Sequence, residues 1–288
     1  MQQSLTAEET IGSAARRHVR ELVQYRFLLR NLVARDLKVR YKNSLLGVFW
    51  SLLNPLLMMV VFSLIFTIFR NDGVRDYSVF FLVGLIPWNF FSSSLMAGTV
   101  SITSNDALIK KVYFPRELLP SAAILSNLVH FLIALLVLVG FLYGSGLGLT
   151  VHALWVPLIL LTQLIFTLGL ALFCGALHVF YRDVVMILDV LLLAGFFLTP
   201  IFYPLELYGA RQVIAGISFV PAQLMRWLNP MASIVDAYRT VLWGTTGSSG
   251  PAPMDLAFFA RTLITAIITL LVGYTLFART QHLFGEKL

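Results

Sequence analysis

Residues 34–66 read ARDLKVRYKNSLLGVFWSLLNPLLMMVVFSLIF, and the change of character within this stretch decides the fold. Its first part carries four cations, which are Arg35, Lys38, Arg40 and Lys42. No charged residue occurs from Val48 to Phe69. About 20 apolar residues in a helix cross the ~30 Å hydrocarbon layer of a membrane. The stretch therefore predicts a basic segment at a membrane surface that leads directly into a transmembrane helix.

Apolar runs of similar length recur along the rest of the chain. Hydrophobic residues make up 58% of the 288 residues and charged residues only 12%, which is more apolar surface than a soluble domain of this size can bury. Six runs are long enough to span, at 48–69, 79–103, 118–143, 153–180, 184–203 and 256–278. We therefore expect an all-α integral membrane protein with six transmembrane helices.

Lysine and arginine residues are distributed unevenly between the segments that join these runs. If the N-terminus is cytoplasmic, fifteen of the 21 lie on the cytoplasmic side, where such residues are usually enriched. This predicts a cytoplasmic segment at 1–47, a six-span domain at 48–278 and a cytoplasmic C-terminal segment at 279–288. The net charge of +7 then points to anionic lipid rather than to nucleic acid.

Two regions are neither spans nor tight turns. Residues 18–33 place their apolar side chains on one helical stripe, which predicts an amphipathic helix at the membrane interface with a basic polar side. Residues 205–243, on the opposite side, contain apolar pieces too short to span, so we expect short helices that lie on the membrane or dip into it. Within them, Asn229 followed by Pro230 is typical of a helix start.

A short charged segment, 104–117, interrupts the apolar sequence between the second and third runs. Ser104, Asn105 or Asp106 could cap a short helix there, and Pro115 would end it. Lys110 and Lys111 could hold this helix to anionic lipid. Alternatively, the segment could dock into a cytoplasmic partner through its apolar side chains, which are Leu108, Ile109, Val112, Tyr113 and Phe114. Composition alone does not choose between these two roles.

The sequence contains no motif that indicates catalysis. It lacks the GxxxxGK[ST] loop that cradles the phosphates of ATP, and its only adjacent acidic pair is Glu8–Glu9. We therefore expect no catalytic residue, no metal site and no cofactor in this chain. His130 and His178 fit helix packing. Asp189, a carboxylate inside a predicted span, either has a functional role or pairs with a neighbouring basic group near the inner interface.

Aromatic residues are frequent at the ends of the predicted spans, and the chain has 23 Phe, 10 Tyr and 5 Trp residues. An aromatic belt at the membrane interface is the ordinary explanation. In another interpretation, some rings line a path for sugars, whose C–H faces stack on aromatic rings. The sequence by itself favours the belt.

Four segments together resemble the permease subunit of ABC-2 type polysaccharide exporters, which include O-antigen, teichoic acid and capsular polysaccharide permeases. They are 34–66, GLIPWNFFSSSL at 84–95, LIKKVYFPRELLP at 108–120 and LNPMASIVDAYRTVLWG at 228–244. The resemblance extends over roughly residues 20 to 285.

The resemblance implies a homodimer in which each subunit binds a separate ATPase subunit that holds ATP and Mg²⁺. Segment 104–117 would be the family's coupling helix, which seats in the ATPase. Its expected contact residues are Asn105, Asp106, Leu108, Ile109, Lys110, Lys111, Tyr113, Phe114 and Pro115. The family's amphipathic interface helix would match 18–34, and its short extracellular helices would match 205–243.

The resemblance also implies a cargo, namely polysaccharide linked through diphosphate to a polyprenol, exported across the bacterial cytoplasmic (inner) membrane. The lipid diphosphate would arrive at Arg35, Lys38, Arg40 and Lys42, although simple anchoring at the membrane explains these cations equally well. The glycan pathway would be lined by Phe49, Trp50, Trp88, Phe196, Phe197, Phe202 and Tyr203. The alternatives are an ABC-2 exporter of a lipid or drug and, less favoured, a membrane polyprenyl-phosphate glycosyltransferase.

Overall fold

The computed structural model describes residues 24–42, 47, 50–69, 74–205, 209, 212–214, 217–245 and 250–288, and these are helical except for loops and one hairpin. The longer helices are α2 (Arg26–Tyr41), α3 (Trp50–Phe69), α4 (Tyr77–Val100), α6 (Leu118–Gly144), α7 (Val156–Phe180), α8 (Val184–Leu198), α10 (Pro230–Leu242) and α11 (Leu256–Thr280). The shorter elements are α5 (Asp106–Lys111), α9 (Pro221–Leu228), α12 (Phe284–Lys287), and strands β1 (Gln212–Ile214) and β2 (Ile217–Phe219). Residues 18–23 of the predicted interface helix, and Phe49, lie outside the described residues.

Among the described residues, four helical segments are long and apolar enough to cross a membrane. They are Tyr77–Val100, Leu118–Gly144, Val151–Phe180 and Leu256–Lys287, which contain α4, α6, α7 and α11. Two further apolar helices are shorter, over Leu52–Ile65 in α3 and over α8. The prediction of a helical, multi-pass membrane protein is confirmed, and α3 and α8 are the elements on which the count of six spans depends.

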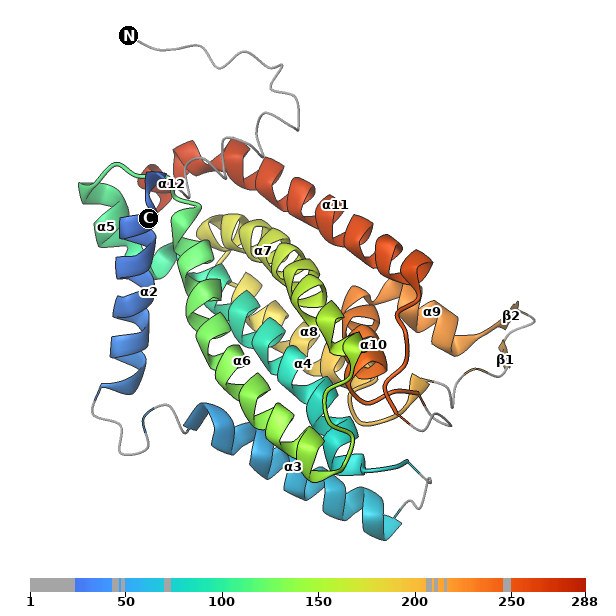
Figure 1. Cartoon of the computed structure of the whole chain (residues 1–288). Coiled ribbons are helices and arrows are strands. Elements are labelled where there is room, and N and C mark those ends of the chain that lie inside the picture. Colours follow the sequence, from blue (N-terminus) through green and yellow to red (C-terminus); the bar gives the residue numbers. More distant parts are fainter. Residues whose placement is uncertain are drawn as a thin grey trace.

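Helix α4 forms the centre of the bundle, and α3, α6, α7, α8 and α10 all pack against it (Figure 1). Phe80, Phe81 and Val83 of α4 have no solvent-accessible surface. Helix α3 lies against α4 and α6 at the edge of the bundle, and Ser63 of α3 is hydrogen-bonded to Ser78 of α4 at 2.9 Å. Because lipid tails are as apolar as these side chains, close packing rather than exclusion of water holds such helices together.

Two glycines allow α7 and α11 to pack closely along their length. A Cβ atom added to Gly169 of α7 would lie 2.6 Å from the backbone of Leu270 in α11. A Cβ atom added to Gly273 of α11 would collide with the carbonyl oxygen of Gly169. Small residues at such crossings let two membrane helices approach closely. The close contact of α7 and α11 therefore depends on glycine at these two positions.

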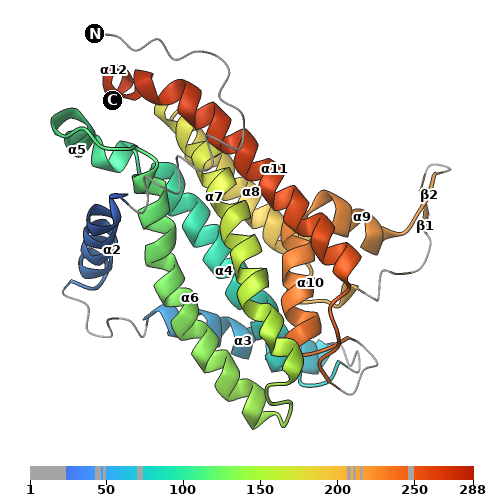
Figure 2. The ribbon, with the colours of Figure 1, turned by 45° about the horizontal axis from the view of Figure 1, so that its top comes forward.

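The two ends of α11 mark opposite ends of the bundle (Figures 1 and 2). At one end, Leu32 of α2, Ile109 of α5 and Phe284 of α12 belong to one buried apolar cluster. The β1–β2 hairpin, α9 and α10 lie at the other end, where α10 packs on α4, α7 and α11.

The segment between α8 and α11 confirms one prediction and changes another. Helix α10 begins at Pro230, and the Asn229 side chain accepts hydrogen bonds from the backbone N–H groups of Met231 (3.0 Å) and Ala232 (3.2 Å), as an N-cap residue does. We expected short helices within residues 205–243, but Gln212–Ile214 and Ile217–Phe219 pair as the β1–β2 hairpin before α9 begins. The β-branched residues in these strands favour the extended backbone.

Candidate functional site

Helix α2 has one apolar face on the bundle and one basic face on the outside. It packs along α6, and Leu32 is buried, whereas Phe27 and Val39 are exposed together with the cations. The helix continues to Tyr41, well beyond residue 34. Its exposed cations are Arg26, Arg30, Arg35, Lys38 and Arg40. The sole acidic residue of α2, Asp36, pairs with Arg35 at 2.9 Å, so most of the positive charge is unbalanced.

A cavity of about 570 Å³ lies between the end of α2 and helices α3, α4 and α6. The described residues that line it include a single cation, Arg40, and no carboxylate. Asn89 lies halfway along the 24-residue helix α4, and His130 lies halfway along the 27-residue helix α6. The cavity therefore reaches toward the middle of the membrane, although its wall is partly polar.

Two hydrogen bonds fasten the end of α2 to α6 at this cavity. Arg40 Nη1 donates to Oδ1 of Asn127 at 2.8 Å, and the hydroxyl of Tyr41 lies 2.8 Å from Nδ1 of His130. The Asn127 side-chain N–H group donates to the carbonyl oxygen of Ala123 at 3.1 Å, which turns its own carbonyl toward Arg40. Arg40 makes no second hydrogen bond to a described residue, so its other N–H groups can serve an anionic ligand.

Of the four cations predicted to receive a lipid diphosphate, only Arg40 lines the cavity. Arg35 is engaged by Asp36, and Lys38 and Lys42 are exposed outside it. Sequence patterns did not reveal the other polar residues that line the cavity, and His130 was assigned to packing. These residues are Tyr41, Asn54, Asn89, Ser92, Ser93 and Asn127. Uncharged amides within predicted spans were the signal that could have revealed them.

The charged segment between α4 and α6 forms an exposed projection. Helix α5 ends at Lys111, the backbone is extended at Val112, and residues 112–115 form neither helix nor strand. Phe114 is 5% exposed within the apolar cluster of α2 and α12, whereas the Tyr113 side chain is 98% exposed. The projection therefore presents Tyr113, together with Lys110 and Lys111, to a partner or a lipid surface.

The start of α5 differs from the predicted cap. The Asn105 side chain donates to the carbonyl oxygen of Ser101 at 2.7 Å instead of accepting from the helix. Oδ1 of Asp106 accepts a 2.6 Å hydrogen bond from the N–H group of Ala107. The turn is thus joined to the end of α4 rather than capped as a separate helix.

Arg116 ties the base of this projection to the C-terminal residues. Its Nη1 donates to the carbonyl oxygen of Gln281, and its guanidinium carbon lies 5.8 Å from the centre of the Phe284 ring in α12. Burial lowers the pKa of Arg116, and the neighbouring Glu117 carboxylate opposes this shift. The C-terminal end of the chain therefore supports the projection that carries Tyr113.

The predicted glycan-pathway residues fall into two groups. Five of them form a chain of ring contacts near α8, namely Trp88, Phe196, Phe197, Phe202 and Tyr203. Trp88 and Tyr203 are buried in this chain of rings, whereas Phe197 is exposed on α8. Phe62 of α3 joins the group, 5.9 Å from the Phe202 ring and 6.3 Å from the ring of Phe196 in α8. Trp50 lies apart from them, at the polar cavity, and is 56% exposed.

Asp189 is exposed on α8 among apolar residues. It forms no ion pair or hydrogen bond with any other described residue, so the expected pairing with a nearby basic group does not occur in this part of the chain. Within the described residues, no three His, Cys, Asp or Glu side chains are grouped so that they could hold a metal ion.

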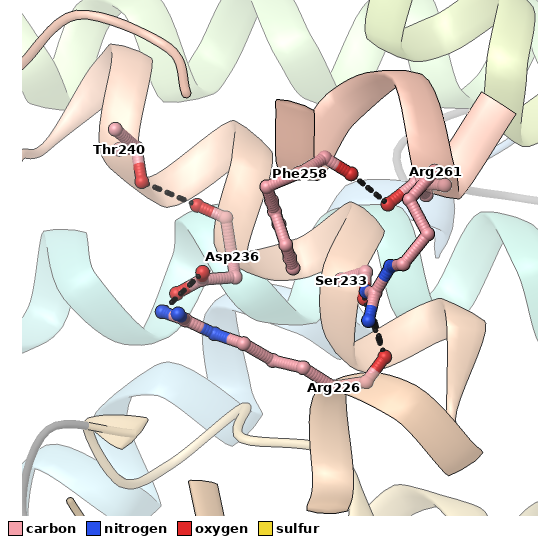
Figure 3. A network of polar contacts seen from close by, with 7 residues as sticks. Arg226, Ser233, Asp236, Thr240, Phe258 and Arg261 are labelled. Atoms are coloured by element: carbon pink, nitrogen blue, oxygen red, sulfur yellow. Dashed lines mark hydrogen bonds and ion pairs between the residues drawn. The ribbon is translucent and has the colours of Figure 1, made fainter. Parts of the chain in front are cut away.

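A second polar network joins α9, α10 and α11 at the opposite end of the bundle (Figure 3). Arg226 of α9 forms a 2.8 Å ion pair with Asp236 of α10. Arg261 of α11 donates to Oγ of Ser233 at 2.8 Å and to the carbonyl oxygen of Arg226 at 2.9 Å. Both guanidinium groups lie about 5 Å from the Phe258 ring. The network fixes the short helices to α11, and none of its residues was predicted.

Comparison with known proteins places these features in a family. Residues 28–243 match the ABC-2 type transporter family. The chain is 34% identical over 274 residues to the O-antigen export system permease protein RfbA of Myxococcus xanthus, which covers 94% of this chain and 99% of that protein. It is 31% identical to a protein of the same name from Klebsiella pneumoniae, over 91% of this chain and 95% of that protein. It is 25% identical to the polysialic acid transport protein KpsM of Escherichia coli, over 87% and 92% of the two chains. The chain belongs to the ABC-2 type transporter family of membrane proteins.

Proposed function

We propose that this chain is the membrane subunit of an ATP-driven exporter of lipid-linked polysaccharide. The observation that carries the proposal is the similarity to O-antigen export permeases over 94% of the chain. The polysialic acid transport proteins, although more distant, are also named for a polysaccharide. Charged residues are few within the described apolar helices, which suits a neutral, hydroxyl-rich cargo better than an ionic one.

The proposed topology has six spans, with α3 and α8 completing the set formed by α4, α6, α7 and α11. Both termini, α5 and α12 then lie in the cytoplasm of a bacterial cell, and the hairpin, α9 and α10 lie outside. The distribution of lysine and arginine residues supports this orientation. The corresponding boundaries are a cytoplasmic segment at 1–47, a membrane domain at 48–278 and a cytoplasmic end at 279–288.

The exposed projection at α5 is the contact for a separate ATPase subunit, which would hold ATP and Mg²⁺. An aromatic ring that is 98% exposed beside two lysines gives a partner both an apolar anchor and charge. Its buried neighbour Phe114 and the support from Arg116 hold the projection in place, so movement of the ATPase would be transmitted to α4 and α6.

A second copy of the chain would cover the outer faces of α3 and α8. A ring contact between Phe62 and Phe196 (6.3 Å) joins these two helices, and both expose large apolar side chains. Asp189 on this surface favours a partner or a water-filled path over lipid, because an unpaired carboxylate is unstable in hydrocarbon. The exposed ring of Phe197 would then face the glycan path between the two copies.

Deletion of the gene tests the proposed function. Surface glycan is assayed together with the lipid-linked glycan left on the cytoplasmic leaflet. The proposal predicts loss of the surface polymer and accumulation of finished, lipid-linked chains inside. Normal surface glycan would favour export of another lipid or of a drug, and loss of polymer without accumulation would indicate an enzyme of its synthesis.

A further inference from the structure

Two asparagines that line the cavity between α2, α3, α4 and α6 have unsatisfied side chains. Neither Asn54 of α3 nor Asn89 of α4 forms a side-chain hydrogen bond with another described residue. Asn89 occupies the middle of a membrane-spanning helix, where a polar group without a partner destabilises the protein. Two free amides on the wall of one cavity therefore point to a ligand that hydrogen-bonds with both donors and acceptors.

The charge of the cavity limits what this ligand can be. Its described lining combines the single cation Arg40 with several neutral polar groups and no carboxylate. Arg40 is held in place by Asn127 and retains free N–H groups, an arrangement that suits a phosphate oxygen. The amides of Asn54 and Asn89 suit hydroxyl groups, which also donate and accept.

Shape and apolar surface add a third constraint. Trp50 is more than half exposed at this cavity, whereas Phe90 and Phe131, which also line it, are almost fully buried. The flat apolar face of a sugar ring can rest on the Trp50 ring while its hydroxyls reach the amides. The volume of about 570 Å³ falls within the range of small-ligand sites and can hold a sugar with an attached phosphate group.

From these observations we infer that the cavity binds a glycosyl phosphate, with Arg40 on the phosphate and with Asn54 and Asn89 on the hydroxyls of the attached sugar. The inference rests on the proposed function, because the ligand is then the junction between lipid and glycan in the cargo. It assigns to this chain a recognition site for the first sugar. The basic face of α2, which ends at Arg40, leads from the cytoplasmic end of the bundle to this site.

Binding to the full-length chain, copurified with its ATPase subunit and placed in lipid nanodiscs, tests the inference. Two probes are compared, a polyprenyl diphosphate that carries one N-acetylglucosamine and the same polyprenyl diphosphate without sugar. The double variant Asn54→Leu/Asn89→Leu keeps the branched shape of the side chain but removes both amides. We expect it to weaken binding of the sugar-bearing probe by about tenfold or more, because the variant removes the hydrogen bonds that both amides make to the sugar. Its binding of the sugar-free probe should change by less than about twofold.

Matched control variants distinguish loss of the cavity site from effects that any substitution on these helices would have on binding. Arg40→Gln should weaken both probes, whereas Arg30→Gln, on the exposed part of α2 away from the cavity, should weaken neither. Asn31→Leu provides the same amide-to-leucine change outside the cavity. Size-exclusion chromatography and recovery of the ATPase subunit establish that each variant is folded, and a cavity variant that fails this check is replaced by Asn54→Ser or Asn89→Ser.

Three outcomes would overturn the inference. The double variant could bind the sugar-bearing probe normally, or it could lose both probes equally. Phosphatidylglycerol could also displace the sugar-bearing probe at equal concentration, which would make the cavity a site for bilayer lipid. If deletion of the gene still causes internal lipid-linked glycan to accumulate, each of these results removes the sugar site but leaves the proposed export function intact.

Discussion

The guanidinium group of Arg40 donates a 2.8 Å hydrogen bond to Oδ1 of Asn127, which fastens the last turn of α2 to α6. Asn127 is buried, whereas Arg40 reaches it from the basic outer face of α2. This hydrogen bond places the positive charge of Arg40 at the polar cavity within the bundle. The cations of α2 therefore differ in their surroundings, because Arg40 lines the cavity and the others lie on the outer face of the helix.

Removal of the positive charge at the end of α2 should affect the response to cargo. In the variant Arg35→Gln/Lys38→Gln/Arg40→Gln, we expect stimulation of ATPase activity by lipid-linked substrate to fall by about tenfold, because Arg40 loses its charge-assisted contact to phosphate and the outer face of α2 attracts the anionic cargo less strongly. The basal rate of the complex should fall less. Equal loss of both rates would mean that these cations only support the structure.

Tyr113 should anchor the ATPase subunit. Tyr113→Ala is expected to reduce copurification of the ATPase about tenfold or more, since buried aromatic anchors commonly dominate an interface. Because this ring is 98% exposed, the variant should leave the stability of the isolated chain unchanged. Tyr143→Ala, at an exposed position on the other end of α6, is the control, and equal copurification by both variants would refute the docking role.

Variants at Phe114 and at the two lysines should distinguish residues that hold the projection in position from residues that contact the ATPase subunit. Phe114→Asp puts a carboxylate into an apolar cluster, so we expect both lower thermal stability and loss of the ATPase. Lys110→Glu with Lys111→Glu should weaken copurification without changing the melting temperature. If the lysine variant retains the ATPase but no longer binds anionic vesicles, the alternative role of a lipid-bound helix is correct.

The close contact of α7 and α11 should depend on its glycines. Gly169→Leu is expected to destabilise the chain by about 3 kcal/mol or prevent its folding, because the added side chain meets the α11 backbone. Gly140→Leu in α6 is the matched control, since an added Cβ meets no atom within 4 Å there. Yield and monodispersity in size-exclusion chromatography distinguish the two variants, and equal behaviour would contradict this packing.

The ion pair of Arg226 and Asp236 should stabilise the packing of α9 against α10. Asp236→Ala removes the partner of a partly exposed cation, and we expect a loss of about 2 kcal/mol, between the values for surface and buried pairs. Thermal unfolding in detergent measures this loss. The double variant Arg226→Ala/Asp236→Ala should lose less than the sum of the two single variants. Simple additivity would show that the two side chains do not interact.

The sequence contained most of the information for the membrane helices but little for the cavity. Uninterrupted apolar runs predicted the elements that became α4, α6, α7 and α11, and Asn229–Pro230 predicted the start of α10. These signals are local, since a run of one helix length must satisfy its own backbone in a membrane. The hairpin at Gln212–Phe219 was missed because the segment is short and its β preference is weak evidence without the partner strand.

The site required tertiary contacts that no spacing encodes. Arg40 and Asn127 are 87 positions apart, and Tyr41 and His130 are 89 apart. The sequence identified the basic cluster but could not show that Arg35 is bound to Asp36 while Arg40 enters a cavity. For the projection, the pattern suggested partner contact, but only the three-dimensional structure distinguished buried Phe114 from exposed Tyr113. The glycan-pathway residues stay a prediction, because the path requires a second copy of the chain.

Transport by the purified complex tests the central claim most directly. Lipid-linked glycan extracted from the deletion strain is reconstituted with this chain and its ATPase subunit in proteoliposomes, and its exposure to an external lectin is followed after ATP addition. The account predicts an ATP-dependent change in the fraction of glycan that the lectin reaches, absent with a complex that carries Tyr113→Ala. ATP hydrolysis without any movement of the glycan, or movement that does not depend on ATP, would contradict it.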